Sequence, residues 1–160
     1  MPQPTVHLRD AFNTRMPYDR APRTVDAMRS PAEAVWNRAL ELPTPAAASH
    51  PGDAALLIVL TFHGLVTNGG LFNAVELHGH DDVYPIDAVV EAYHALGLED
   101  AAGAIDNAAL EERDIDDDDD EARRDAERRI DATYTVDEAT IESALAAQLR
   151  ESPGAFAPLT

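Results

Sequence analysis

The sequence contains no cysteine and no lysine, and only 6% of its 160 residues are aromatic. Without cysteine, disulfides, thiolate metal sites and cysteine nucleophiles are excluded, and the composition suits the reducing cytoplasm, where we expect the protein to reside. The longest apolar run, residues 54–60, is far shorter than the ~20 residues that a helical membrane span needs. Residues 1–10 also lack the apolar centre of a signal peptide.

The sequence also lacks the common catalytic and nucleotide-binding motifs. Neither G-x-G-x-x-G nor G-x-x-x-x-G-K-[ST] occurs, so no phosphate-binding loop is predicted. G-x-S-x-G is absent as well, which removes the usual setting of a nucleophilic serine in hydrolases. We therefore expect no enzymatic activity and no cofactor.

Positive charge is scarce, because 12 arginines stand against 30 acidic residues and give a net charge of −18. Residues 1–50 hold six arginines and five acids, so residues 51–160 hold the remaining six arginines and 25 acids. Such a surface repels nucleic acids and anionic membranes and attracts basic proteins. We expect a basic protein surface as the partner, with no direct binding to nucleic acid or membrane. High genomic GC content and adaptation to high salt produce similar compositions, and they are the alternative explanations of the charge.

Apolar residues recur at helical spacing, and no segment alternates with the period of a strand. The sequence predicts an all-α fold, a single compact domain of about six to seven helices over residues 30–152. An irregular N-terminal arm (1–29) precedes it and a C-terminal tail (153–160) follows. Ser30, Pro31 and Glu33 form a helix-start signature, with Leu40 on the buried face of the helix that follows.

A central, nearly all-apolar helix is predicted over residues 54–67, with Asp53 as its N-cap. Asn68-Gly69-Gly70 should end it in a tight turn, with Gly69 or Gly70 at positive φ, because these residues tolerate left-handed conformations. A short helix over 71–77 and a loop over 78–82 are expected next.

Four further helices complete the prediction. Pro85 should occupy the first position of a helix that carries an apolar stripe from Ile86 to Leu96 and stops at Gly97. Helices over 99–111 and 122–132 are expected to follow. The last helix should open on a capping box, Thr135 to Glu138, and end near residue 150.

The strongest charge feature is the segment DIDDDDDE, residues 114–121. The first, third, fifth and seventh residues of this segment are aspartates, as at the start of an EF-hand calcium loop. However, Asp119 stands where that loop needs glycine and Asp125 where it needs glutamate, so no calcium site is predicted. We expect a solvated acidic face that binds the partner, made of Asp114, Asp116, Asp117, Asp118, Asp119, Asp120, Glu121, Asp125 and Glu127.

His78 and His80 lie two residues apart beside Asp81 and Asp82. Histidine and carboxylate groups of this kind bind Zn²⁺ in many proteins, so a metal-dependent enzyme is kept as an alternative hypothesis. Spacing of this kind also arises often by chance in polar loops, and the sequence therefore predicts no metal site here.

Several segments resemble the DNA-mimic protein 19 family, also called domain of unknown function 4375. They are the Asn68-Gly69-Gly70 turn with Leu71-Phe72-Asn73 after it, the helix over 88–97, the paired alanines of 101–109 and the segment 129–134 (RIDATY). The resemblance covers residues 54–150. This chain departs from the family pattern Phe-x-Gln-Tyr-Phe after the turn, where it has LFNAVE.

The resemblance implies an all-helical fold and, for part of the family, homodimers. It also implies a role in transcription regulation, because at least one relative uses its acidic surface to occupy the DNA site of a transcription factor. An immunity protein that neutralises a toxin is the alternative that the family leaves open.

Overall fold

The apolar helix expected at the centre of the fold is α2 (Pro51–His78), which contacts four of the other α-helices. The computed structural model describes residues 29–160, so nearly all of the predicted N-terminal arm lies outside the described residues. By length and composition α2 could span a membrane, but more than half of its most apolar window is buried inside the protein. It is the core helix of a globular domain.

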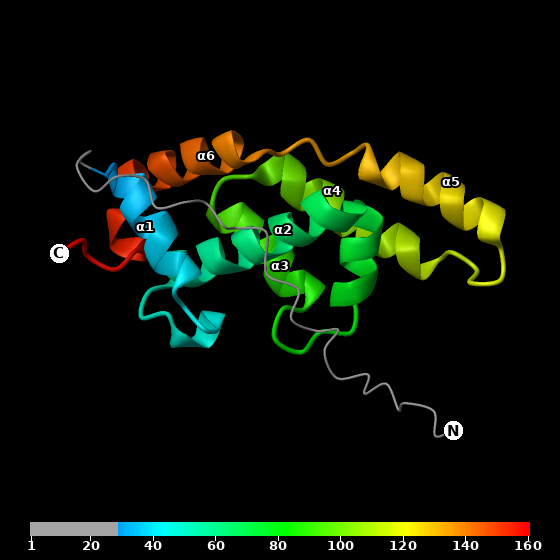
Figure 1. Ribbon diagram of the computed structural model, residues 1–160, viewed down its shortest axis with the longest axis horizontal. Coiled ribbons are helices and arrows are strands. Elements are labelled where there is room, and N and C mark those ends of the chain that lie inside the picture. Colours follow the sequence, from blue (N-terminus) through cyan, green and yellow to red (C-terminus); the bar gives the residue numbers. More distant parts are fainter. Residues whose placement is uncertain (1–28) are drawn as a thin grey trace, which may run out of the picture.

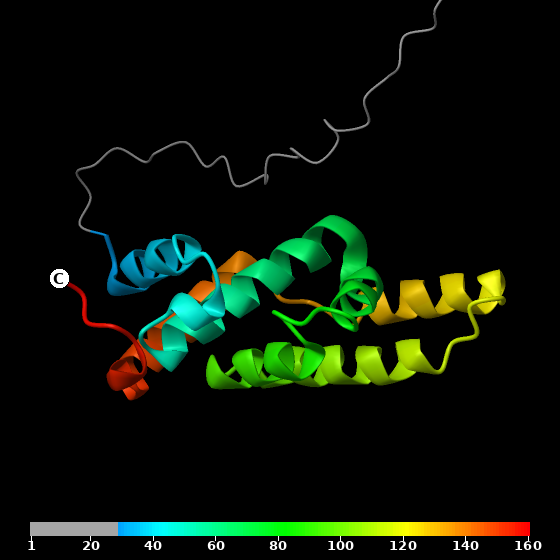
Figure 2. The ribbon, with the colours of Figure 1, turned by 90° about the horizontal axis from the view of Figure 1, so that it is seen from below.

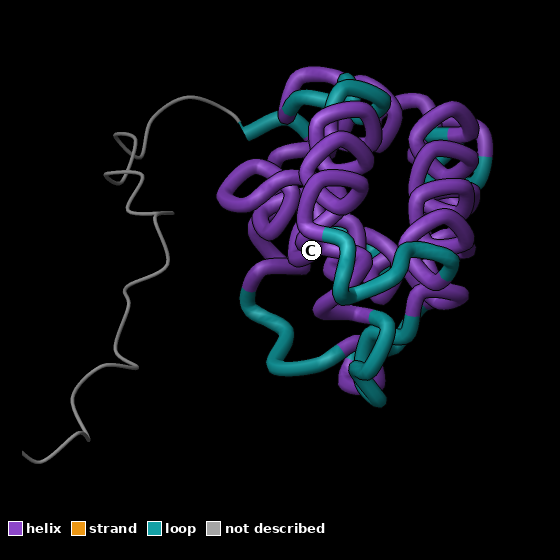
Figure 3. The backbone as a smooth tube through the Cα atoms, turned by 90° about the vertical axis from the view of Figure 1, so that its right-hand side faces the viewer, coloured by secondary structure: helices purple, strands orange, loops and turns teal. Residues whose placement is uncertain are grey.

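The other elements surround α2, and every regular element among the described residues is helical (Figure 3). This confirms the all-α prediction. The α-helices are α1 (Pro31–Leu40), α3 (Ile86–Ala95), α4 (Glu99–Arg113), α5 (Asp120–Asp131) and α6 (Glu138–Glu151), with short 3₁₀ turns η1 (Pro45–Ala47) and η2 (Pro153–Ala155). In Figure 1, α5 and α6 follow one another along the long axis, while α1 and the C-terminus lie at the end opposite α5.

The core is built from small and aliphatic side chains with few aromatics. The stripe predicted on α3 is confirmed, since Ile86, Val89, Tyr93 and Leu96 are all buried. The turn after it is also confirmed, because Gly97 has φ 74° and its N–H donates to the carbonyl of His94 at 2.9 Å. On α1, by contrast, Leu40 was expected to be buried but is 45% exposed.

Asp53 was predicted to cap the central helix, and this is wrong. The helix starts earlier, at Pro51, because proline fits the first helical position and has no N–H to satisfy there. The Asp53 side chain is instead buried. Its Oδ1 accepts hydrogen bonds from Nε and Nη2 of Arg38 at 2.9 and 2.7 Å, and its Oδ2 accepts one from the backbone N–H of Ala157 at 2.8 Å. The carboxylate ties α1 and the C-terminal segment to α2, and neighbouring Phe156 is buried in the core.

Three other helix starts differ from the predictions. Pro85 is the N-cap of α3 rather than its first helical residue, so this helix begins one residue later than expected, at Ile86. Helix α5 begins at Asp120 rather than Ala122. The capping box at Thr135 is wrong, because α6 begins at Glu138 with Asp137 as its cap. Oδ1 of Asp137 accepts from both the backbone N–H and the hydroxyl of Thr140, at 2.8 and 2.7 Å.

Candidate partner-binding surface

The acidic segment 114–121, called the acidic loop below, connects α4 to α5 and reaches the start of α5. α4 runs towards one end of the long axis, the loop turns the chain there, and α5 runs back from it (Figures 1 and 2). The seven carboxylates of the loop are exposed, with 93% of the Asp117 side chain accessible to solvent. No arginine interrupts them.

The loop has a defined backbone in spite of its charge. Ile115 packs against the core, Oδ1 of Asp116 accepts from the N–H of Asp118, and Oδ1 of Asp119 accepts from the N–H of Ala122, both at 3.0 Å. The second of these bonds caps α5. Two of the seven carboxylates therefore also hold the loop in shape, and a shape formed in advance lowers the entropy that binding would lose.

Arg123 fixes α5 to α2 directly behind the acidic loop. Its guanidinium lies 5.0 Å from the centre of the Phe72 ring and donates through Nη2 to Oε1 of Glu76 at 2.5 Å. The hydrogen bond to Glu76 raises the pKa of Arg123 further above its ordinary value. Nη1 of Arg123 also lies 3.6 Å from Oδ1 of Asp117 in the loop. This arginine therefore serves the packing of α5 and is not free for a partner.

The structure does not unite all nine predicted residues on one face. Asp125 and Glu127 lie two positions apart on α5, and such residues point to different sides of a helix. Asp125 is paired with Arg128, and exposed Arg124 lies between the acids of α5. Over its whole length α5 holds five acids and four arginines. Between the acidic loop and α5, the uncompensated negative charge therefore lies on the loop.

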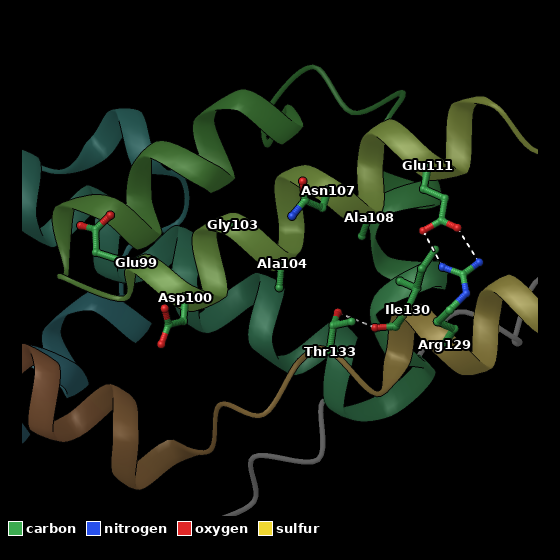
Figure 4. A pocket seen from close by; sticks show the side chains of 10 residues that line it. All are labelled: Glu99, Asp100, Gly103, Ala104, Asn107, Ala108, Glu111, Arg129, Ile130 and Thr133. Atoms are coloured by element: carbon green, nitrogen blue, oxygen red, sulfur yellow. Dashed lines mark hydrogen bonds and ion pairs between the residues drawn. The ribbon is translucent and has the colours of Figure 1, made fainter.

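A groove of about 410 Å³ runs along α4 from Glu99 to Glu111, with residues 129–133 beside it (Figure 4). Its floor is made of small residues, Gly103, Ala104 and Ala108, and polar groups of Asn107 and Thr133 line it. Glu99 and Asp100 lie at one end, as Figure 4 shows.

At the other end of the groove, Glu111 of α4 pairs with Arg129 of α5 through two contacts, of 2.9 and 2.5 Å. The hydrogen bonds from Arg129 lower the pKa of Glu111. This pair bridges the two helices and leaves neither charge unpaired.

The predicted turn is confirmed at Gly70, which has φ 85° and ψ 162° and breaks α2 into two helical parts. Asp131, the last residue of α5, completes the turn, because its Oδ1 accepts from the backbone N–H of Phe72 at 2.9 Å. It thus caps the second helical part. The sequence pattern gave no sign of this pairing, because the two residues are 59 positions apart.

Segment 129–134 also holds the core together. The hydroxyl of Tyr134 lies 3.0 Å from Nδ1 of buried His63 and 2.7 Å from the hydroxyl of buried Tyr93. Burial lowers the pKa of His63, against the opposing effect of Glu138 and Asp137. Tyr134 and Asp131 are therefore structural residues.

The two candidate metal ligands have different surroundings. His78 is the last residue of α2 rather than part of a loop, and it is buried with its Nδ1 2.7 Å from the carbonyl oxygen of Tyr84. His80 is exposed. Within residues 29–160 no group of three or more histidine and acidic side chains is placed to hold a metal ion.

A family model described as DMP19-like protein matches residues 47–152, which span α2 to the end of α6 together with the acidic loop and the groove. This confirms the resemblance noted over residues 54–150. No curated protein and no solved structure matches the chain significantly.

Proposed function

Because the chain belongs to the DMP19-like protein family, we propose that it is a non-enzymatic acidic binding protein that occupies the DNA-binding surface of a basic protein. The acidic loop is the part of the molecule that would take the place of DNA. The charge density of this loop is the observation that carries the proposal.

The acidic loop places seven carboxylates within eight residues. Eight residues span at most about 28 Å when fully extended, so the loop carries at least about one negative charge per 4 Å. One strand of duplex DNA carries one phosphate per ~3.4 Å of its axis. The two densities are comparable. The loop therefore offers a basic protein a field like that of a short stretch of DNA backbone.

The same comparison of charge densities argues against α5 as the main contact with the basic partner. Asp120 and Glu121 at its start already count in the acidic loop, and the rest of the helix holds three acids and four arginines. A cationic surface gains little from such a mixed row, because the arginines oppose it. Binding through the loop should also weaken with salt, because the screening length falls from ~8 Å at physiological ionic strength to ~3 Å at 1 M.

The experiment starts with the full chain immobilised and a lysate of the source cells applied at low salt. A DNA mimic should retain DNA-binding proteins, and added duplex DNA should release them because both compete for one surface. Retained proteins that stay bound in the presence of excess duplex would contradict the proposal.

Two variants with equal charge changes assign the surface. The loop variant carries Asp117→Asn, Asp118→Asn, Asp120→Asn and Glu121→Gln, which spares the hydrogen bonds of Asp116 and Asp119. The matched control variant neutralises four exposed acids elsewhere, with Asp82→Asn, Asp87→Asn, Glu91→Gln and Glu151→Gln. We expect the loop variant to lose the DNA-releasable proteins and the control to keep them. Equal loss in both would show that only the net charge matters.

A further inference from the structure

Gly103 has no structural role in the described part of the chain. It is an exposed residue within the 15-residue helix α4, and a Cβ atom added there would meet nothing within 4 Å. Glycine lowers the stability of a helix interior relative to alanine. Gly70 and Gly97, by contrast, adopt positive φ that other residues avoid. A glycine without such a need fits a place where another backbone approaches closely.

The groove around Gly103 has the length of a helical segment. It extends from Glu99 to Glu111, which are 12 positions apart on α4 and so about 18 Å, or three turns. Its floor of glycine and alanine lets a second helix approach to the short end of the usual 8–10 Å between axes. Asn107 and Thr133 add polar groups along the sides.

The charges of the groove select a cationic occupant. Glu99 and Asp100 are exposed at one end, and the other end leads through the last turn of α4 into the acidic loop. Arg129 does not offset these charges, since both of its Nη atoms contact Glu111. A helix with arginine or lysine near its two ends would find Glu99 and Asp100 at one end of the groove and the acidic loop beyond the other end.

We propose that a basic α-helix of the partner lies in this groove along α4, with its backbone against Gly103 and its cations on Glu99, Asp100 and the acidic loop. This inference rests on the proposed function and names the element of the partner. Many DNA-binding proteins place a recognition helix in the major groove, and a protein that takes the place of DNA would receive the same helix.

The probe is a fluorescein-labelled, alanine-based peptide of about 16 residues, long enough to form a helix, with arginines near both ends. Fluorescence anisotropy measures its dissociation constant from the full chain at low salt. Gly103→Trp should weaken binding at least about tenfold because the indole fills the groove, whereas Gly103→Ala should weaken it less, by about two- to fourfold, because a single methyl group only pushes the partner backbone slightly outward. Gly103→Gln is a smaller obstruction and should lie between them. Circular dichroism checks that each variant is folded.

Each result points to one conclusion. The groove is not the site, and this inference is overturned, if wild type does not bind the peptide or if folded Gly103→Trp binds it like wild type. Neither result decides the proposed function, which has its own test. If the groove variants lose the peptide and the loop variant retains DNA-releasable proteins, the helix site stands and the proposed role of the acidic loop fails. Equal losses in Gly103→Trp and Gly103→Ala would also overturn the inference, since a methyl group obstructs the groove far less than an indole.

Discussion

Replacing Gly70 with alanine should destabilise the protein severely. The residue has φ 85° and ψ 162°, a conformation that is almost restricted to glycine and costs other residues about 1–3 kcal/mol. An added Cβ would also lie 2.4 Å from Oδ2 of Asp131. Asp131 would have to move and would lose its hydrogen bond to the N–H of Phe72, a charge-assisted bond worth about 1.5–3 kcal/mol.

Together the two effects predict a loss of about 3–5 kcal/mol in the free energy of unfolding. For a chain of this size that corresponds to a fall in melting temperature of roughly 6–20 °C. Urea denaturation followed by circular dichroism gives the free energy directly. Gly69→Ala is the matched control, because its Cβ would meet only the movable side-chain amide of Asn73, and it should change stability by less than about 1 kcal/mol.

A double-mutant cycle separates the two effects. In the Asp131→Ala background the close contact no longer exists, so Gly70→Ala should cost only its backbone strain, about 1–3 kcal/mol. The two substitutions should therefore be less than additive. The reasoning is refuted if Gly70→Ala costs less than about 1 kcal/mol in the wild-type background, or if its cost is unchanged when Asp131 is absent.

Three further changes test other parts of the fold. Gly103→Ala should raise the free energy of unfolding by about 0.5–1 kcal/mol in urea denaturation, because alanine is the better helix former and its methyl group enters open space; a loss of stability would mean that the groove is not open there. Asp53→Ala should cost about 3 kcal/mol in the same assay, because it leaves the Arg38 guanidinium and the Ala157 N–H without their acceptor. A cost below about 1 kcal/mol would show that this carboxylate does not hold α1 and the C-terminal segment to α2. Burial lowers the pKa of His63, so the unfolded chain binds a proton at higher pH than the folded one, and stability is lost as pH falls from the unfolded pKa of ~6.5 towards the lower folded pKa. Between about pH 7 and pH 5 the wild type should therefore lose more stability than His63→Gln, and equal losses would contradict the assignment.

Local patterns sufficed for most of the fold. The stripe from Ile86 to Leu96, the glycine at position 97 and the Asn68-Gly69-Gly70 turn are all decided by residues near one another in the chain. Their helices and breaks were predicted because periodicity and positive φ leave their mark on short segments.

The errors arose where a side chain has a distant partner. Asp53 looked like a cap because an aspartate before an apolar run usually is one, yet Arg38 and the C-terminal segment draw it into the core. Asp131 looked like one acid among many, although it caps the turn 59 residues earlier in the sequence. Such pairings depend on how helices pack, and local patterns do not contain that information.

The acidic surface was predicted in outline and sharpened by the structure. The run 114–121 was evident from the sequence, but Asp125 and Glu127 were grouped with it because they follow closely in the chain. Helical geometry places these two on different sides of α5, and one of them is paired with Arg128. The groove along α4 was not predicted, because it forms only where residues 129–133 pack beside α4.

The central claim is that the acidic loop takes the place of DNA on its partner, and displacement of a labelled DNA duplex from a captured partner tests it most directly. The account predicts that the wild type and the matched control variant displace the duplex as their concentrations rise, and that the loop variant does not. A ternary complex, in which the partner binds the duplex and this protein at the same time, would contradict the claim.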